Sequence, residues 1–234
     1  SLELTPKHEK AYQTRLTRER QKVLGLLGDW EENRMAIFRS LTIMRQLSLH
    51  AGLVDDADLD IASSKIDYLA EKLPELIAEG HSALVFSTFT GFLRLIAERL
   101  DQIGLTHSYL DGSMSAARRR TVIAEFTGGT TRVFLISLKA GGFGLNLTEA
   151  DYCFVCDPWW NPAAEAQAVD RAHRIGQTRP VTVYRLVSAG TMEEKVVELQ
   201  ERKRALFTSV MDEGDVFGGS IGADDIRQLF GGQT

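Results

Sequence analysis

Two arginines in the segment DRAHRIGQ, residues 170–177, have the type and spacing that phosphate chemistry requires. If residues 162–174 form a helix, Gln167, Arg171 and Arg174 lie at i, i+4 and i+7 along one stripe. Guanidinium groups are planar and permanently charged, which suits them to a phosphate chain. They can also neutralise the charge that develops on a phosphoryl group during its transfer. The stripe therefore predicts contact with a phosphate-bearing ligand.

Ordinary ion pairing is the alternative for these two arginines. Glu165 and Asp170 lie off the stripe, although Asp170 can pair with Arg174 across one helical turn. That pairing still leaves the positive charge of Arg171 unpaired.

A glycine-rich turn, SLKAGGFGLNLTEAD at residues 137–151, could hold phosphate with its bare amides. One alternative is the dinucleotide fingerprint G-x-G-x-x-G, but Leu147 stands where the third glycine belongs. A simple tight turn is the other alternative, although such a turn rarely needs three glycines followed by Asn146 and Thr148. We therefore favour a functional turn, with these glycines: Gly141, Gly142 and Gly144.

The segment DPWWNP, residues 157–162, places Trp159 and Trp160 between two prolines. Tryptophan is most often a core residue, whereas the flanking prolines indicate a stiff surface turn. Both interpretations stay open here: a buried ring, or an exposed ring that meets a nucleic-acid strand.

Several other sites are disfavoured by the sequence. It contains neither G-x-x-x-x-G-K-[ST] nor a D-E-x-H box, so we expect the arginines to act on a ligand held mainly elsewhere. Cys153 and Cys156 spell C-x-x-C, but YCFVC is typical of a buried strand. Because the five histidines are also scattered, we predict no metal site.

These loops must be positioned by regular elements, and the hydrophobic pattern from residue 81 predicts which. Short apolar runs alternate with helical stretches, which predicts a doubly wound α/β fold with a parallel sheet between helices. The expected strands are SALVFSTF, THSYL, TRVFLIS, DYCFVCD and VTVYRLV. Ligands of such sheets bind at the carboxyl ends of the strands. The informative loops are therefore those after Phe86, Leu110, Ile136, Val155 and Val187.

Outside the predicted sheet, residues 7 to about 50 have helical spacing, and VDDADLDIASSK reads as an exposed linker. A helix is expected to start around Lys65, with Ser64 as its cap. The tail beyond Met211 is glycine-rich and acidic, with one short helix at ADDIRQLF.

Composition is that of an ordinary globular chain, with 44% apolar and 25% charged residues among 234. The net charge of -5 excludes a uniformly basic coat, so phosphate binding must come from local patches.

No run suits a membrane span or signal peptide, which predicts an intracellular protein. Because the chain begins at Ser1, we expect a piece of a longer polypeptide, with a tag scar as the alternative. The basic clusters are Arg15, Arg18, Arg20 and Lys22; Arg118, Arg119 and Arg120; and Arg171, Arg174, Arg179 and Arg185.

Together these segments resemble the second RecA-like lobe of superfamily-two helicase motors, and more narrowly of SWI/SNF-type DNA translocases, over roughly residues 63–205. The most specific motifs are D-P-x-W-N-P, Q-A-x-x-R-x-H-R-I-G-Q and V-Y-R-L-V-x-x-G-T-x-E-E. The resemblance implies a helical protrusion and linker at 1–62, the RecA-like lobe at 63–190, and a helical brace with a flexible tail at 191–234.

The resemblance also implies roles for individual residues. Arg171 and Arg174 match arginine fingers that reach ATP on the other lobe, with Gln167 beside them. Coupling to the nucleotide cleft falls to Gly142, Gly144 and Asp170. The implied DNA contacts are Ser87, Thr88, Phe89, Ser113, Arg118, Ser137, Lys139, Gly141, Asn146 and Trp160. This sequence departs from the family pattern at Thr88, where many relatives have Gln, and at Phe143, where Glu or Thr is usual.

The expected function is that of one motor lobe of an ATP-dependent translocase on double-stranded DNA, inactive by itself. ATP and magnesium would be held mainly by a first RecA-like lobe of the same polypeptide. Nucleoprotein or a polymerase is a further possible partner, and no membrane contact is expected. We expect a bacterial protein of the cytoplasm or nucleoid, or a nuclear one in a eukaryote. The rival hypotheses are a degenerate lobe that only binds nucleic acid or protein, a dinucleotide-binding domain, and a strand-separating helicase.

Overall fold

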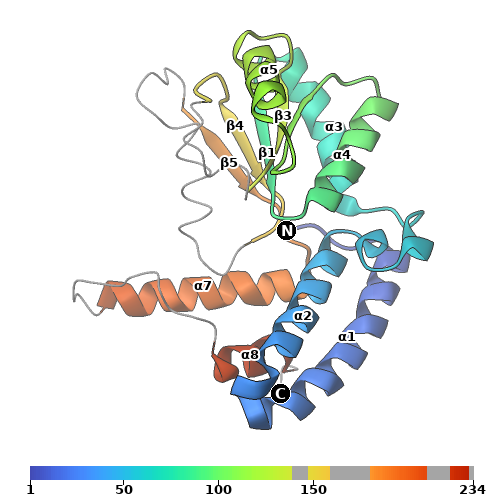
Figure 1. Ribbon diagram of the computed structural model, residues 1–234, viewed down its shortest axis with the longest axis vertical. Helices are drawn as coiled ribbons and strands as arrows, with labels where there is room; N and C mark the ends of the chain where they lie inside the picture. The colour runs from blue at the N-terminus through green and yellow to red at the C-terminus, as the bar shows by residue number, and fades with distance from the viewer. Residues whose placement is uncertain (139–146, 159–179, 210–221, 232–234) are drawn as a thin grey trace. The chain divides into compact units, whose positions relative to one another are not determined.

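The computed structural model describes residues 1–138, 147–158, 180–209 and 222–231 (Figure 1). The chain divides into two compact units. Residues 64–157 and 163–186 form one, here called the sheet unit. The helical unit combines both ends of the chain: residues 1–63, 158–162 and 187–234. Sequence patterns far apart along the chain therefore contribute to one helical core.

The sheet unit contains the five predicted strands, all parallel, in the order β2-β3-β1-β4-β5. Every residue of β1 and β3 is buried, as expected for inner strands covered on both faces. The predicted doubly wound fold is confirmed. The strands are β1 (Ala83–Ser87), β2 (Ser108–Leu110), β3 (Val133–Ser137), β4 (Tyr152–Val155) and β5 (Thr182–Arg185).

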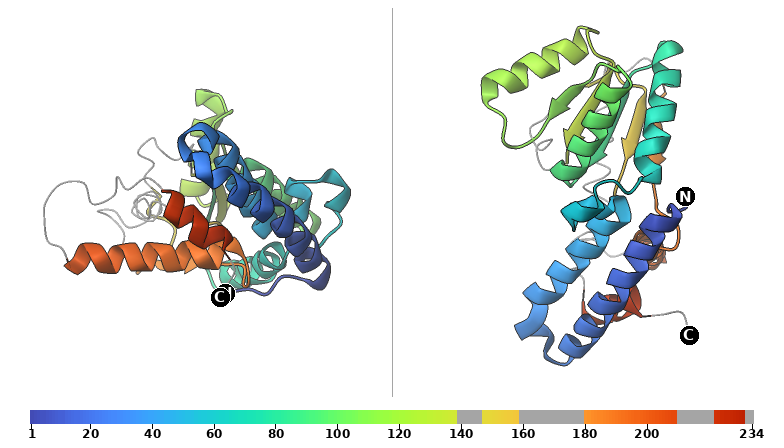
Figure 2. Two further views of the ribbon diagram at one scale, coloured as in Figure 1. Left: turned by 90° about the horizontal axis from the view of Figure 1, so that it is seen from below. Right: turned by 90° about the vertical axis from the view of Figure 1, so that its right-hand side faces the viewer.

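Helices cover both faces of this sheet, and Figure 2 draws α3 and α5 on opposite sides of it. These helices are α3 (Ser64–Ala78), α4 (Thr90–Gln102) and α5 (Ala116–Thr127). On the α5 face, Phe126 packs against Phe134 with ring centroids 5.2 Å apart. Leu84 and Phe86 belong to the same buried cluster, because alternate residues of a strand share a face.

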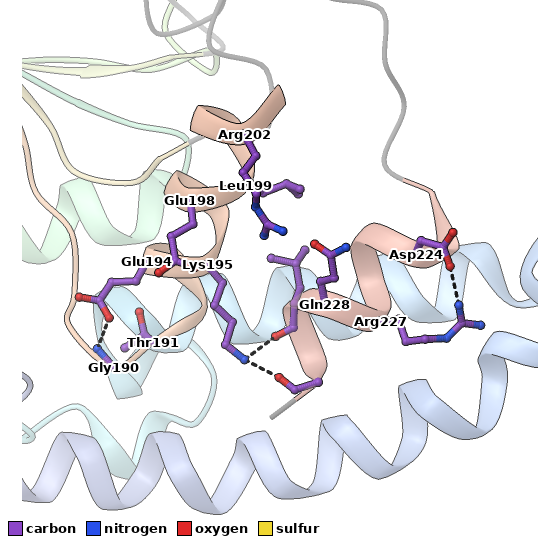
Figure 3. Close-up of a pocket in the computed structure, with 12 residues that line it drawn as sticks. Gly190, Thr191, Glu194, Lys195, Glu198, Leu199, Arg202, Asp224, Arg227 and Gln228 are labelled. Atoms are coloured by element: carbon purple, nitrogen blue, oxygen red, sulfur yellow. Dashed lines mark hydrogen bonds and ion pairs between the residues drawn. The ribbon is translucent and has the colours of Figure 1, made fainter. Parts of the chain in front are cut away.

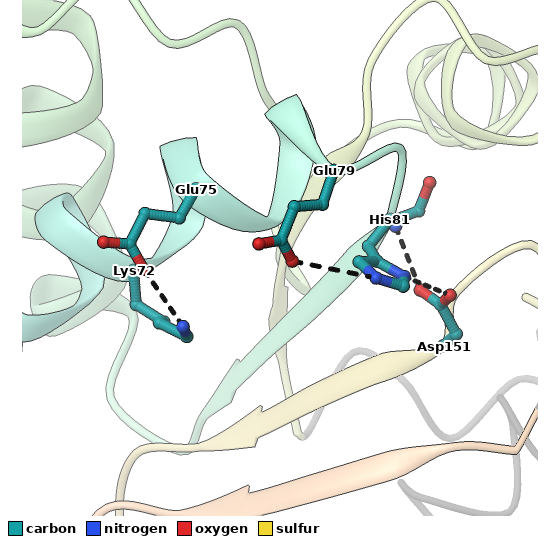
Figure 4. A network of polar contacts seen from close by, with 6 residues as sticks. Lys72, Glu75, Glu79, His81 and Asp151 are labelled. Atoms are coloured by element: carbon teal, nitrogen blue, oxygen red, sulfur yellow. Dashed lines mark hydrogen bonds and ion pairs between the residues drawn. The ribbon is translucent and has the colours of Figure 1, made fainter.

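A polar contact fixes the amino edge of the sheet, away from the strand ends where ligands are expected (Figure 4). His81 Nδ1 lies 2.7 Å from Asp151 Oδ2, and the Ser82 amide donates to Asp151 Oδ1 at 3.1 Å. The residues that precede β1 and β4 are thereby tied together. Beside them, Glu79 approaches His81 at 4.0 Å.

The helical unit begins with a hairpin of two helices, α1 (Pro6–Leu26) and α2 (Trp30–Leu49), joined by the 3-10 turn η1 (Leu27–Asp29). The helical region expected over residues 7 to about 50 is thus interrupted. Gly25 and Gly28 are poor helix formers, and the Asp29 backbone (φ -117°, ψ 59°) leaves the helical region. The interruption lets the apolar stripes of α1 and α2 pack against each other.

The carboxyl-terminal segment completes this core. It supplies α7 (Met192–Ser209) and α8 (Ala223–Phe230), and α8 coincides with the predicted ADDIRQLF helix. Tyr12 of α1 is fully buried, and its hydroxyl accepts a 2.7 Å hydrogen bond from the Met192 amide. Between α2 and α3, the linker forms two further 3-10 turns, η2 (Ala51–Leu53) and η3 (Asp56–Asp58).

A pocket of about 750 Å³ lies between α7 and α8 (Figure 3). Lys195 Nζ donates to the carbonyls of Leu229 at 3.1 Å and Gly231 at 2.8 Å, so the lysine caps the end of α8. Burial, with the nearby Arg20, lowers the pKa of Lys195. Lys195 is thus engaged in holding the end of α8. Across the described ranges, no helix is long and apolar enough to cross a bilayer.

Candidate functional site at the carboxyl edge of the sheet

Two predicted DNA-contact residues, Ser87 and Ser137, end neighbouring strands and are register partners. Both are buried, at 0% and 1% exposure. The Ser87 hydroxyl accepts from the Phe89 amide at 3.1 Å, and the Ser87 carbonyl accepts from Leu138 at 2.9 Å. In this conformation Ser87 shapes the turn that carries Thr88 and Phe89 and does not itself reach solvent.

Thr88 joins the end of β1 to the end of β4. Its amide donates to both carboxylate oxygens of Asp157, at 3.1 and 3.2 Å, and its hydroxyl donates to Asp157 Oδ2. Asp157 is 1% exposed and is the first residue of DPWWNP. A buried carboxylate must be satisfied by donors, and Thr88 provides two. The structure therefore couples two loops that the sequence predicts to be functional.

A second buried polar contact supports the same strand end from α3. Lys65 is 1% exposed, and its Nζ donates to the Cys156 carbonyl at 2.6 Å. A buried ammonium requires such acceptors, so the side chain is committed to this position. The end of β4 is thus fixed by α3 and by the Thr88 turn together.

The loop after β2 is organised by Asp111. This buried carboxylate accepts from the Ser113 hydroxyl at 2.5 Å, the Ser113 amide at 2.9 Å and the Tyr109 hydroxyl at 3.0 Å, while Arg94 lies 3.8 Å away. The Ser113 hydroxyl bond is the main cause that holds the pKa of Asp111 below its ordinary value, against the opposing effect of burial. Ser113 is exposed and held in place by a charged acceptor.

Beyond that loop, α5 starts with an unusual charge pattern. Ser115 caps the helix by accepting from the Arg118 amide at 3.2 Å, and the first turn contains no acidic residue. Arg118 and Arg120 are exposed. Because the helix dipole disfavours cations at an amino terminus, these guanidinium groups gain nothing from the helix. Exposed arginines at the positive end of a helix are suited to an anion.

Ten of the predicted site residues lie outside the described residues. They are Lys139, Gly141, Gly142, Gly144, Asn146, Trp160, Gln167, Asp170, Arg171 and Arg174.

Cys153 and Cys156 are both buried and free of disulfides. Burial raises the pKa of Cys153 to about 12, with a smaller contribution from Asp151, so its thiol is neutral and unreactive at ordinary pH. In the described part of the chain, no group of three or more His, Cys, Asp or Glu side chains could hold a metal ion. The C-x-x-C spacing therefore belongs to a buried strand end.

Comparison with known proteins identifies the domain type. Residues 64–176 match the family described as helicase conserved C-terminal domain. DNA repair protein RAD5A of Arabidopsis thaliana is 42% identical over 171 residues, which cover 73% of this chain and 16% of that protein. ATP-dependent helicase rhp16 of Schizosaccharomyces pombe is 36% identical over 207 residues, with coverages of 87% and 23%. The chain spans less than a quarter of the length of these relatives.

The solved SWI2/SNF2 ATPase C-terminal domain of Sulfolobus solfataricus is 26% identical, with a TM-score of 0.74 and coverages of 97% of this chain and 94% of that one. This chain is a SWI2/SNF2-type helicase C-terminal domain. The Sulfolobus solfataricus SWI2/SNF2 ATPase core in complex with dsDNA aligns with the whole helicase C-terminal domain at 27% identity and a TM-score of 0.77. The alignment covers 49% of that core.

Two buried residues of the helicase C-terminal domain, Asp157 and Lys65, escaped the sequence prediction. Asp157 had a signal, because a carboxylate directly after an apolar strand falls where a sheet binds ligands. Lys65 had none, since a lysine at a helix start normally points to water. Only the fold brings its ammonium to the Cys156 carbonyl.

Proposed function

We propose that this domain is the second motor lobe of an ATP-dependent translocase on double-stranded DNA. One observation carries the proposal: hydrogen bonds between Thr88 and Asp157 join the strand ends that bear two helicase motifs. The membership in the SWI2/SNF2 family and the likeness to a core solved with dsDNA support the choice of ligand. Exposed Ser113 and Arg118 extend the same edge.

The proposed mechanism is closure of two lobes around ATP. ATP and magnesium are assigned mainly to the first RecA-like lobe of the parent polypeptide, where the nucleotide supplies the transferable phosphoryl group. Arg171 and Arg174 are assigned to its phosphates, with Gln167 beside them. Loops at the carboxyl edge hold the DNA backbone, so alternating closure and opening moves the lobe along the duplex. By this assignment the domain alone hydrolyses nothing.

The test is made in the complete polypeptide, with Arg171→Ala and Arg174→Ala as separate variants. Loss of a guanidinium that acts in the transition state lowers ATP turnover by about a thousandfold or more, whereas duplex affinity changes little. Lys139→Ala is the matched contrast, since loss of a phosphate contact weakens DNA binding and flattens its salt dependence. Equal losses of ATP turnover and DNA affinity in the arginine variants, or no loss of either, would contradict the roles assigned to Arg171 and Arg174.

The same assays address the rival functions. A degenerate binding lobe requires that duplex DNA leave the ATPase rate of the complete polypeptide unchanged. A strand-separating helicase requires release of a strand from forked DNA. We expect stimulation by duplex DNA and no strand release. The cellular location then follows the DNA: the nucleoid in a bacterium, or the nucleus in a eukaryote.

A further inference from the structure

Helix α1 of the helical unit is strongly basic within an acidic chain. Its 21 residues, PKHEKAYQTRLTRERQKVLGL, contain six lysines and arginines but two glutamates. The difference of +4 contrasts with the net charge of -5 for all 234 residues. The basic residues are Lys7, Lys10, Arg15, Arg18, Arg20 and Lys22.

Four of these charges share one face of α1, here called the basic stripe: Lys7, Lys10, Arg18 and Lys22. At 100° per residue, all four fall within one third of the helix circumference. The opposite face is the buried one and includes Tyr12 and Val23. The stripe therefore lies off the buried face of α1.

Within the residues that the structure describes, the two glutamates of α1 leave Lys7, Lys10 and Arg18 of the stripe without an ion pair. Glu19 is buried and pairs with Arg15 at 2.9 Å, and it reaches Lys22 only at 3.9 Å. Glu9 lies on another side of the helix. Lys7, Lys10 and Arg18 are exposed, and across the described ranges none of them makes an ion pair.

Stability of the helix does not account for this placement. Lys7 and Lys10 occupy the first turns of α1, where the helix dipole disfavours cations. The last turn of α1, where a cation would stabilise the helix, carries no basic residue. The charges thus sit where an anionic partner would gain from both the side chains and the helix terminus.

The groove beside α1 narrows the choice of partner. It measures about 430 Å³; the stripe forms one wall, and Asp55 and Asp58 stand on the other. Asp55 is engaged by the Ala57 amide at 3.0 Å. Lys7, Lys10 and Arg18 line this groove, and Lys22 lies beyond it. Because the two carboxylates repel phosphate from the other wall, we expect an anionic ligand to lie along the α1 wall.

The composition of the stripe favours nucleic acid over protein. Protein interfaces are enriched in aromatic residues and depleted of lysine, whereas this stripe is lysine-rich and has no aromatic member. Rows of Lys and Arg spaced along one line are typical of contacts to a phosphate backbone. From Lys7 to Lys22 the helix advances about 22 Å, a length over which duplex DNA presents about 13 charges.

We propose that the basic stripe of α1 binds the phosphate backbone of double-stranded DNA, as a second contact surface distinct from the carboxyl edge of the sheet. The choice of duplex DNA rests on the proposed function. The stripe itself rests on the exposure and missing ion pairs of Lys7, Lys10 and Arg18. It adds affinity without sequence preference, because phosphates carry no base identity.

The test uses this chain and a fluorescent DNA duplex, with Lys7→Gln, Lys10→Gln and Arg18→Gln combined in one variant. The control combines Arg20→Gln, Arg34→Gln and Arg39→Gln, which removes the same charge from exposed positions off the stripe. Three lost phosphate contacts lower the slope of log K against log salt by about 2.7. The ratio of parent to variant affinity then shrinks about 40-fold between about 50 and about 200 mM salt.

Equal slopes for the stripe variant and the control would overturn the proposal, provided circular dichroism shows both folded. A stripe variant that loses binding to a polyglutamate peptide but keeps its DNA slope would also overturn it, in favour of an acidic protein partner. A third variant, Arg118→Gln with Arg120→Gln, reports on the sheet edge alone. If only this edge variant weakens DNA binding, DNA binding by the stripe is refuted while the proposed function stands. If none of the variants weakens DNA binding, both proposals are refuted.

Discussion

Replacing Asp157 tests whether the carboxyl edge is held by the contact on which the proposed function rests. The carboxylate is 1% exposed and receives hydrogen bonds from the Thr88 amide and hydroxyl. A hydrogen bond to a charged group is worth about 1.5–3 kcal/mol. Thr88 is only half-buried, so water replaces part of what Asp157→Ala removes. We expect a net loss of about 2 kcal/mol in the local stability of this turn.

Amide hydrogen exchange at Thr88, followed by NMR, measures that stability directly. A loss of about 2 kcal/mol accelerates exchange about thirtyfold in Asp157→Ala. Asp157→Asn keeps one acceptor without the charge, and about fivefold is expected. Asp67→Asn on α3 is the control, because it removes an exposed carboxylate from the same unit.

One outcome of this experiment would contradict the coupling of Thr88 to Asp157. If exchange at Thr88 in Asp157→Ala matches the Asp67→Asn control, the turn is held by something else and the edge is not coupled as described. A double-mutant cycle with Thr88→Val sharpens the result. Residues in direct contact are non-additive, so the two single losses should sum to more than the double loss.

Two further predictions concern the helical unit. Burial, and then the nearby His8, lower the pKa of His50 below its ordinary 6.5, and its Nδ1 accepts from the Gly52 amide at 2.9 Å. The unfolded chain therefore binds the proton first, so stability from His50 is complete above about pH 6.5 and is lost as pH falls through the lowered value. Urea unfolding at several pH values should show this loss, and His50→Asn should flatten it; an unchanged pH dependence in His50→Asn contradicts the assignment. Tyr12→Phe leaves the Met192 amide without its acceptor and should cost about 1–2 kcal/mol in thermal unfolding, whereas an unchanged melting temperature would show that water or another group replaces the hydroxyl.

The acidic total of the chain and its proposed ligand are compatible because positive charge is gathered in a few places. The first turn of α5 has exposed arginines and no acidic residue, and the stripe of α1 gathers four exposed lysines and arginines on one face. A field of this kind acts locally, since exposed charges are screened beyond about 8–10 Å in physiological salt. Acidic residues elsewhere on the surface therefore do not cancel these patches.

Periodicity identified the sheet because buried parallel strands are read as uninterrupted apolar runs. TRVFLIS became β3 and DYCFVCD became β4 for that reason. The same reasoning missed the break at Leu27–Asp29, because helical spacing on both sides of a short turn looks continuous in sequence. The chain reverses direction at this turn, while the hydrophobic period of α1 continues into α2.

The sequence by itself determined the family, the order of strands and helices, and the segments whose residues suit phosphate chemistry, because these depend on residue type and short-range spacing. Tertiary structure alone decided that Thr88 meets Asp157, that Lys65 is buried at the end of β4, and that both chain ends share one core around Tyr12. These contacts join residues about 70 to 180 positions apart, and no local pattern encodes such a meeting. A buried polar group is costly unless it is hydrogen-bonded, and only the folded chain brings these partners together.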